Sequence, residues 1–140
     1  MLFRSNNEVE LALLGYLMPR FGHVSVERVC SGLGLPNIYA FLRDTGREIA
    51  PEWLESELVA AADATPVIVG AALNTARACP IAKRTLEIFV DVLAAEAGSF
   101  AVRLLATGGI YFGGVIPPRI LTLLQEPRFR SVSQAKGRLR

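Results

Sequence analysis

The stretch TGGIYFGGVIPPR, Thr107 to Arg119, decides the expected fold of this 140-residue chain. Its centre, residues 110–112, is a short run of β-prone side chains with a pair of glycines on each side. The second pair, Gly113 and Gly114, has no Cβ atoms, so the backbone can turn there and a flat or phosphorylated ligand can approach the main chain. We therefore predict a central strand near 109–113 that ends in a turn open to a ligand.

A long helical pattern leads directly into this strand. From Ile81 to Leu105, apolar residues recur at intervals of three and four, which is the spacing of one buried helix face. At ~1.5 Å rise per residue such a helix is on the order of 38 Å long. Gly98 and Ser99 fall inside it, where a glycine costs about 1 kcal/mol relative to alanine, so we expect another element to pack closely there. A helix followed by a strand and a glycine turn is typical of α/β nucleotide-binding folds.

Length and composition favour a single globular domain. Hydrophobic residues make up 51% of the chain and charged residues 20%, with a net charge of +2. The longest uncharged stretch, Leu104 to Pro118, is too short to cross a bilayer, which takes about 20 apolar residues. The amino terminus shows no hydrophobic segment of signal-peptide length, which predicts a cytoplasmic protein without a membrane span.

The sequence offers no pattern typical of a metal site. Cys30 and Cys79 are the only cysteines and His23 is the only histidine, so no cluster has the spacing that zinc requires. We expect both thiols to be small buried hydrophobic groups and His23 to lie in a loop or a helix cap.

Helical patterns occupy most of the remaining chain. Ser5 and Glu8 have the spacing of a capping box for a first helix that ends near Pro19. The further expected segments are a short turn after Ser25 that contains Glu27 and Arg28, a helix opening at Pro36, one opening at Pro51, one over 66–73, and a short one over 120–124. Residues 67–69 are an alternative strand. A single strand leaves N–H and C=O groups unpaired on both edges, so we expect its neighbours to come from a longer parent protein or from a partner chain.

Two segments together carry a family resemblance. GHVSVERVCSGLGL, residues 22–35, and TGGIYFGGVIPPR, with the long helix ending AEAGSFAVRLLA between them, resemble the bacterial glucokinase family in order and spacing. The resemblance implies an α/β fold in which residues 1–140 form a single partial ribonuclease H-like (actin-like ATPase) domain, mostly helical as it stands. It corresponds to the carboxyl-terminal large-domain portion of such an enzyme.

The resemblance also implies an activity. Glucokinases transfer the γ-phosphoryl group of ATP to the 6-hydroxyl of glucose with Mg²⁺, a step of glycolysis that depends mainly on positioning and charge neutralisation. By the match to the family's S-x-E-R-V run, Glu27 binds the glucose hydroxyls, and by the match to its strand and turn, Gly113 and Gly114 lie beside the nucleotide. From spacing alone, Glu27 is a first-turn helix acid favoured by the helix dipole.

Other family motifs have no counterpart here. The phosphate loops, the catalytic Asn-Asp pair and the E-G-G-H sugar motif are absent, and Asp44, Asp63 and Asp91 lie in no segment that resembles the general-base site. We therefore nominate no catalytic residue and no metal ligand, and expect the chain alone to lack kinase activity. QAKGR, residues 134–138, approximates a family D-K-G-R run but has Ala135 where an acid is usual.

Two alternative functions remain open at this stage. The chain is alternatively a non-catalytic helical interaction module that adds its open strand to a partner or to a second copy in a homodimer. Nucleic-acid binding is disfavoured, because only Phe129 is interleaved with the cations of the basic tail at 126–140. These cations are Arg128, Arg130, Lys136, Arg138 and Arg140, and we expect them to be solvated.

Overall fold

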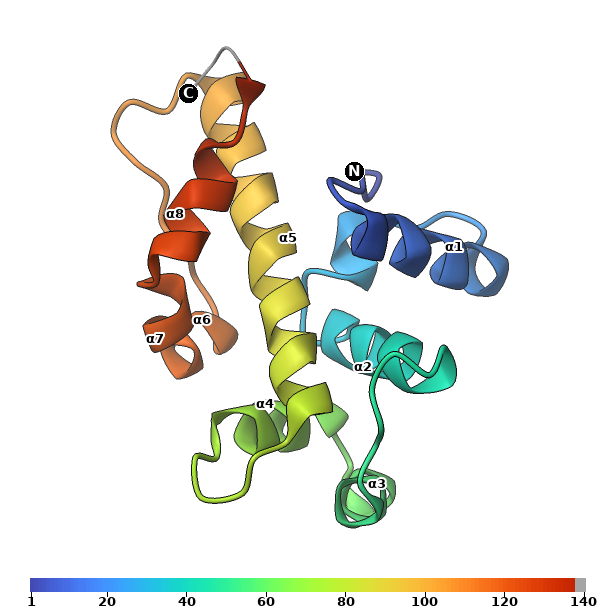
Figure 1. Cartoon of the computed structure of the whole chain (residues 1–140). Helices are drawn as coiled ribbons and strands as arrows, with labels where there is room; N and C mark the ends of the chain where they lie inside the picture. The colour runs from blue at the N-terminus through green and yellow to red at the C-terminus, as the bar shows by residue number, and fades with distance from the viewer. Residues whose placement is uncertain (138–140) are drawn as a thin grey trace. The chain divides into compact units, whose positions relative to one another are not determined.

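The computed structural model describes residues 1–137, and its regular segments are helices (Figure 1). The helices are α1 (Glu8–Phe21), the 3-10 turn η1 (Val26–Arg28), α2 (Gly34–Asp44), α3 (Glu52–Ala60), α4 (Ala64–Leu73), α5 (Pro80–Leu104), α6 (Ile116–Arg119), α7 (Leu121–Leu124) and α8 (Pro127–Gln134). They divide into two compact units, the first covering Met1–Phe89 and the second beginning at Val90, so that α5 starts in one unit and ends in the other. The expectation of a single partial domain stays a prediction.

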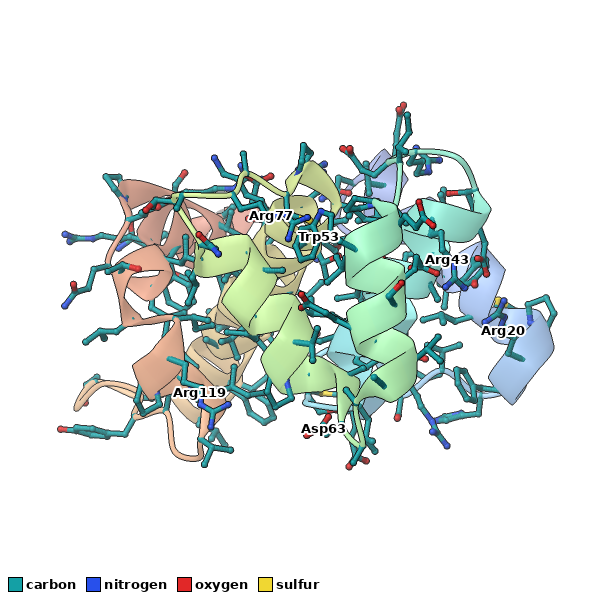
Figure 2. All side chains as sticks on the ribbon, turned by 90° about the horizontal axis from the view of Figure 1, so that it is seen from below. Arg20, Arg43, Trp53, Asp63, Arg77 and Arg119 are labelled. Carbon is teal, nitrogen blue, oxygen red and sulfur yellow. The ribbon has the colours of Figure 1, made fainter. Side chains whose placement is uncertain are left out.

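The first unit has its core around α2. This helix packs against α1 and α4, and α3 packs against α4. The fully buried side chains come from all of these helices and include Leu13, Leu17, Leu35, Ile38, Phe41, Leu42, Leu54 and Ile68. At one edge of the unit, the Arg77 guanidinium lies 3.8 Å from the centre of the Trp53 ring, a cation–π contact that joins α3 to the segment before α5 (Figure 2).

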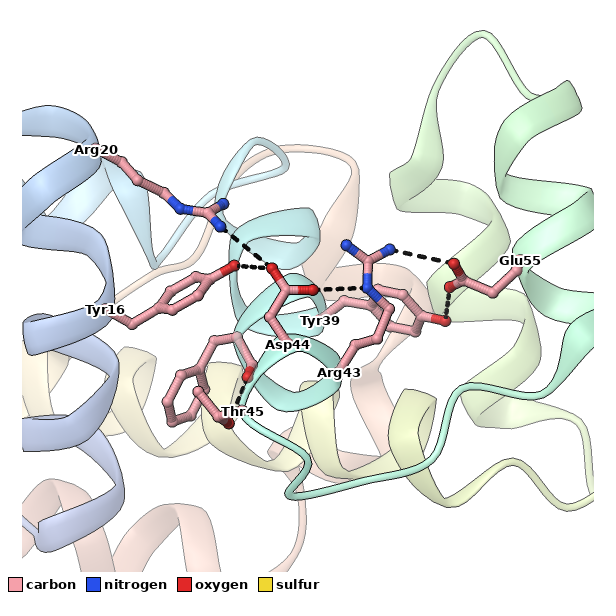
Figure 3. Close-up of polar contacts among 8 residues, drawn as sticks. Tyr16, Arg20, Tyr39, Arg43, Asp44, Thr45 and Glu55 are labelled. Atoms are coloured by element: carbon pink, nitrogen blue, oxygen red, sulfur yellow. Dashed lines mark hydrogen bonds and ion pairs between the residues drawn. The ribbon is translucent and has the colours of Figure 1, made fainter.

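Asp44, at the carboxyl end of α2, receives hydrogen bonds from two helices (Figure 3). From α1, the Tyr16 hydroxyl and the Arg20 Nη2, at 3.2 Å, both donate to Asp44 Oδ2. Arg43 Nε donates to Oδ1 at 2.9 Å. The hydrogen bond from Tyr16, followed by the one from Arg43, holds the pKa of Asp44 below its usual value. Burial and the bond to Asp44 raise the pKa of Tyr16 to about 12.

Arg43 carries this network on to α3. Its Nη1 donates to Glu55 Oε2 at 3.2 Å, while the Tyr39 hydroxyl donates to Glu55 Oε1 at 2.6 Å (Figure 3). Burial, then the bond to Glu55, raises the pKa of Tyr39. The two arginines and two carboxylates compensate each other, so the network ties α1, α2 and α3 together without a net charge.

Replacing Asp44 with Asn should change how stability depends on pH. The pKa of Asp44 is depressed in the folded state, so its contribution is present above the unfolded value of 3.8 and is lost as pH falls through the folded pKa. Urea unfolding should therefore show Asp44→Asn to be less stable than the native chain at pH 7, with the difference shrinking below about pH 4. Glu57→Gln, an exposed carboxylate, is the matched control. A difference independent of pH would contradict this assignment.

The second unit contains the later part of α5, α6, α7 and α8, with α8 lying against α5 (Figure 1). The backbones approach closely at Gly98, where a Cβ atom would lie 1.9 Å from the carbonyl oxygen of Ser133. The expectation that another element packs closely at this glycine is confirmed. Asp91, which the helical pattern places on the polar side of α5, is buried because Arg128 of α8 pairs with it.

Alanine substitutions at two helix glycines should have opposite effects. Gly98→Ala should destabilise the chain by about 1–3 kcal/mol, because the new methyl group meets the backbone of α8. Gly15→Ala in α1 should stabilise it by up to about 1 kcal/mol, since nothing lies within 4 Å of that Cβ position. Thermal unfolding of both variants tests this pair, and equal shifts of the same sign would show that helix propensity alone decides.

The central strand predicted near 109–113 is not confirmed. Residues 110–112 form no strand, and Tyr111 is 92% exposed. Within residues 1–137 no segment pairs with them, and an isolated strand cannot satisfy its own N–H and C=O groups. The expectation that the chain is mostly helical as it stands is confirmed for the described residues, and the central strand is the part of the fold prediction that is not.

The capping residue predicted for the first helix was wrong, and the alternative strand at 67–69 does not form because the helix expected over 66–73 does. Asn7, not Ser5, caps α1 by accepting a hydrogen bond from the Glu10 amide at 2.9 Å, and α1 continues through Pro19 to its end at Phe21. Residues 67–69 lie in α4 and form no strand, as the alanines around them favour. The other expected helices form, including the helical turn after Ser25.

Candidate functional site

Glu27 lies in η1, directly after a short pairing of the amino terminus with residues 24–26. The Phe3 amide donates to the Val24 carbonyl at 2.9 Å, and the Val26 amide donates to the Met1 carbonyl at 3.0 Å. Ser25 precedes the turn, although its side chain makes no capping bond. The Glu27 side chain is exposed, and no residue within 1–137 pairs with its carboxylate.

The backbone of this turn is fastened to α2. Ser31 Oγ donates to the Glu27 carbonyl at 2.6 Å and accepts from the Gly34 amide at 3.2 Å. Asn37 Nδ2 donates to the Arg28 carbonyl at 2.8 Å. A free carboxylate therefore stands on a fixed backbone, which is the arrangement that a preorganised binding group requires.

Gly34 sets the distance between α2 and the turn. A Cβ atom there would lie 2.1 Å from the carbonyl oxygen of Val29, a backbone atom. Here Gly34 serves close packing, and the Gly32 carbonyl accepts a hydrogen bond from the Thr65 hydroxyl of α4.

Gly113 and Gly114 lie in the second unit, in the segment between α5 and α6. Both are exposed, and no atom lies within 4 Å of the Cβ position of either. Gly114 has φ of 106°, a conformation that residues with a side chain rarely adopt. The turn is therefore open, as predicted. Because Glu27 belongs to the first unit, neither unit contains both parts of the predicted site.

The sequence profile of the Glucokinase family matches residues 1–140. The chain belongs to the glucokinase family. It is 38% identical to a glucokinase of Nostoc punctiforme over 148 residues, which cover 99% of this chain and 43% of that protein. It is 33% identical to a glucokinase of Photorhabdus laumondii over 138 residues, covering 99% of this chain and 39% of that protein.

A solved structure agrees with the sequence comparison. The crystal structure of a glucokinase from an Antarctic psychrotroph matches with a TM-score of 0.80 at 30% identity, covering 99% of this chain and 39% of that chain. The chain thus spans about two fifths of the length of the glucokinases that it matches. The resemblance stated from the two segments is confirmed.

The aspartates of this glucokinase-family chain are all engaged in structural contacts. Asp44 belongs to the network of α1 and α2. Asp63 caps α4 by accepting from the Thr65 amide at 2.9 Å, and Asp91 is bound by Arg128. All three aspartate carboxylates therefore have structural partners, and none is assigned as a base for a sugar hydroxyl.

The remaining sequence predictions concern thiols, metals and the membrane. Cys79 is buried, Cys30 is half-buried and His23 is exposed. Within the part of the chain that the structure describes, no three His, Cys, Asp or Glu side chains gather as a metal-binding group. None of the helices described is long and apolar enough to span a bilayer.

The structure describes the basic segment at 126–140 as far as residue 137. Its residues 127–134 form α8, and the side chains of Arg128 and Lys136 bind α5, although that of Arg128 remains 50% exposed. Arg130 is exposed, whereas Arg138 and Arg140 lie outside the described residues.

Sequence reasoning missed Asn37, which helps to hold the turn of Glu27, and the groups that hold α8. The Ser31 and Asn37 bonds run to backbone carbonyls, and the Asp91–Arg128 pair joins residues 37 apart in sequence. The S-G-L-G segment offered a local signal for Ser31 as a cap, but nothing in the chain's spacing pointed to Asn37 or to the long-range pair.

Gly34→Ala should disturb the turn that carries Glu27. The new methyl group meets the Val29 backbone, so we expect a loss of about 1–3 kcal/mol in unfolding free energy. Gly70→Ala in α4 is the control, since that Cβ position is open and the change should be neutral or stabilising. Chemical denaturation measures both, and a neutral Gly34→Ala would show that the turn is free to move.

Proposed function

We propose that this chain is the carboxyl-terminal, large-domain portion of an ATP-dependent glucokinase that phosphorylates glucose at the 6-hydroxyl. The whole-chain match to the glucokinase family is the observation that carries the proposal. In this reading, glucose and ATP are the ligands, the enzyme acts in the cytoplasm, and neither nucleic acid nor membrane is a partner.

Glu27 is the proposed sugar-binding residue. A carboxylate accepts several hydrogen bonds, so one side chain can hold two neighbouring hydroxyls of a sugar edge. Its exposure and its fixed backbone support this role. It binds and orients glucose, and no proton transfer is assigned to it.

Gly113 and Gly114 are the proposed nucleotide contacts. The open Cβ positions and the φ of Gly114 leave room for a base and ribose to lie against the main chain. We further infer that residues 110–112 become a strand in the sheet of the complete enzyme, where the missing neighbours supply the backbone partners that this chain lacks.

Magnesium is implied by the family reaction, but none of the three aspartates in the described residues is left without a partner to hold it. A kinase Mg²⁺ usually binds one or two carboxylates and the substrate phosphates. The aspartates described above are committed to other contacts, so we assign the metal to no residue here. The general base likewise belongs, in this proposal, to the portion of the enzyme beyond this chain.

A chimera tests the proposal. This chain is joined to the amino-terminal portion of the Nostoc punctiforme glucokinase, in place of the matching segment, and glucose 6-phosphate formation is followed. Glu27→Gln should raise KM for glucose about tenfold or more, because hydrogen bonds to a charged group are worth about 1.5–3 kcal/mol. Glu57→Gln should leave KM for glucose unchanged.

The outcome also separates the rival function. A folded chimera without glucose-dependent turnover, together with a 140-residue chain that sediments as a homodimer, would favour the non-catalytic interaction module. An active chimera in which Glu27→Gln has a normal KM for glucose would support the kinase activity and contradict the sugar-binding role of Glu27.

A further inference from the structure

Helix α8 is fastened to α5 at both of its ends. At the first turn of α8, Arg128 Nε donates to Asp91 Oδ1 at 2.8 Å and Nη2 donates to Oδ2 at 2.6 Å. Just beyond its last turn, Lys136 Nζ donates to the Ala95 carbonyl at 2.7 Å and to Ser99 Oγ at 3.1 Å. The partners on α5 are spaced by four residues, so they lie along one face of that helix.

The Arg128–Asp91 pair is the more specific of these fastenings. It is bidentate, and the Asp91 side chain is only 12% exposed, so the pair fixes direction as well as distance. A partly buried carboxylate that lost this arginine would be left without its main compensation. The pair therefore determines where the amino-terminal end of α8 lies on α5.

Phe129, the residue after Arg128, contacts the ring of Phe112 next to the glycine turn. Its ring stands edge-on to Phe112, with centres 5.7 Å apart and planes at 83°. Phe112 directly precedes Gly113 in the chain. An aromatic pair thus connects α8 with the residue that precedes the glycine turn.

The surroundings of Phe112 are otherwise loosely filled. A cavity of about 300 Å³ is lined by Phe112 and Ile110, by α5 residues around Gly98, and by Phe129 and Ser133 of α8. With empty space on this side, few other atoms restrain the segment before the glycines. The Phe129–Phe112 pair is the aromatic contact that joins α8 to this segment.

We propose that the Arg128–Asp91 pair, acting through Phe129 and Phe112, positions the Gly113–Gly114 turn for nucleotide binding. All of these residues belong to the second unit. Arg128, Asp91 and Phe129 are positioning residues that touch neither ligand. The inference rests on the proposed nucleotide role of the two glycines.

The test uses the active chimera and four variants. Arg128→Gln and Phe129→Ala should raise KM for ATP about 2- to 10-fold, the range expected for loss of an aromatic contact, with KM for glucose changed less than about twofold. Phe129→Tyr keeps the ring and should restore KM for ATP. Arg130→Gln removes the same charge from an exposed position on α8 and should change neither constant.

Amide NMR chemical shifts of the 140-residue chain provide a readout independent of activity. The amide signals of 110–115 should move in Arg128→Gln and Phe129→Ala, while those of α2 keep their native positions. Arg130→Gln and Phe129→Tyr should match the native chain in both regions.

The outcomes separate this inference from the proposed function. An unchanged KM for ATP, or equal changes for ATP and glucose, would overturn the positioning role while glucokinase activity stands. Amide signals that move throughout the chain would also overturn it, since that result indicates a general structural role. An inactive native chimera would instead reject the proposed function, and the amide signals of 110–115 would then decide the positioning role alone.

Discussion

The contact of Gly98 with the Ser133 backbone constrains everything in the second unit. Because no side chain separates the two helices there, α8 lies directly on α5, and the bonds of Arg128 and Lys136 can form on either side of that point. Only after α8 is seated does Phe129 meet Phe112. The contact that supports the glycine turn therefore depends on the absence of a side chain at Gly98.

The sequence was a good guide to α5, whose determining interactions are local. The apolar spacing of α5 and the cost of a glycine inside it identified both the helix and a close neighbour at Gly98. The same reasoning failed at residues 110–112, because β-propensity describes side chains that suit a sheet, and a sheet also needs a second strand. The helical pattern did not predict that Asp91 is buried, because Arg128, whose charge compensates that of Asp91, is distant in sequence.

The candidate site shows the same limit. A family resemblance was needed to single out Glu27, since an acid in a first helical turn is common. The structure adds why this acid is suited to binding: the carbonyls on its turn are held by Ser31 and Asn37, while its carboxylate is left to the solvent. The Tyr16–Asp44–Arg43–Glu55–Tyr39 network shows the converse case, in which charged groups satisfy each other and join helices (Figure 3).

The stacking of Arg77 on Trp53 has a consequence for how unfolding of this chain is observed. Trp53 is the only tryptophan, and it lies in the first unit, so indole fluorescence senses the α3 edge of that unit. Circular dichroism, by contrast, averages over the helices of both units. If α8 separates from α5 before the first unit melts, the ellipticity will fall while the emission spectrum stays constant, and a single fluorescence midpoint will overstate the stability of the half that carries the diglycine.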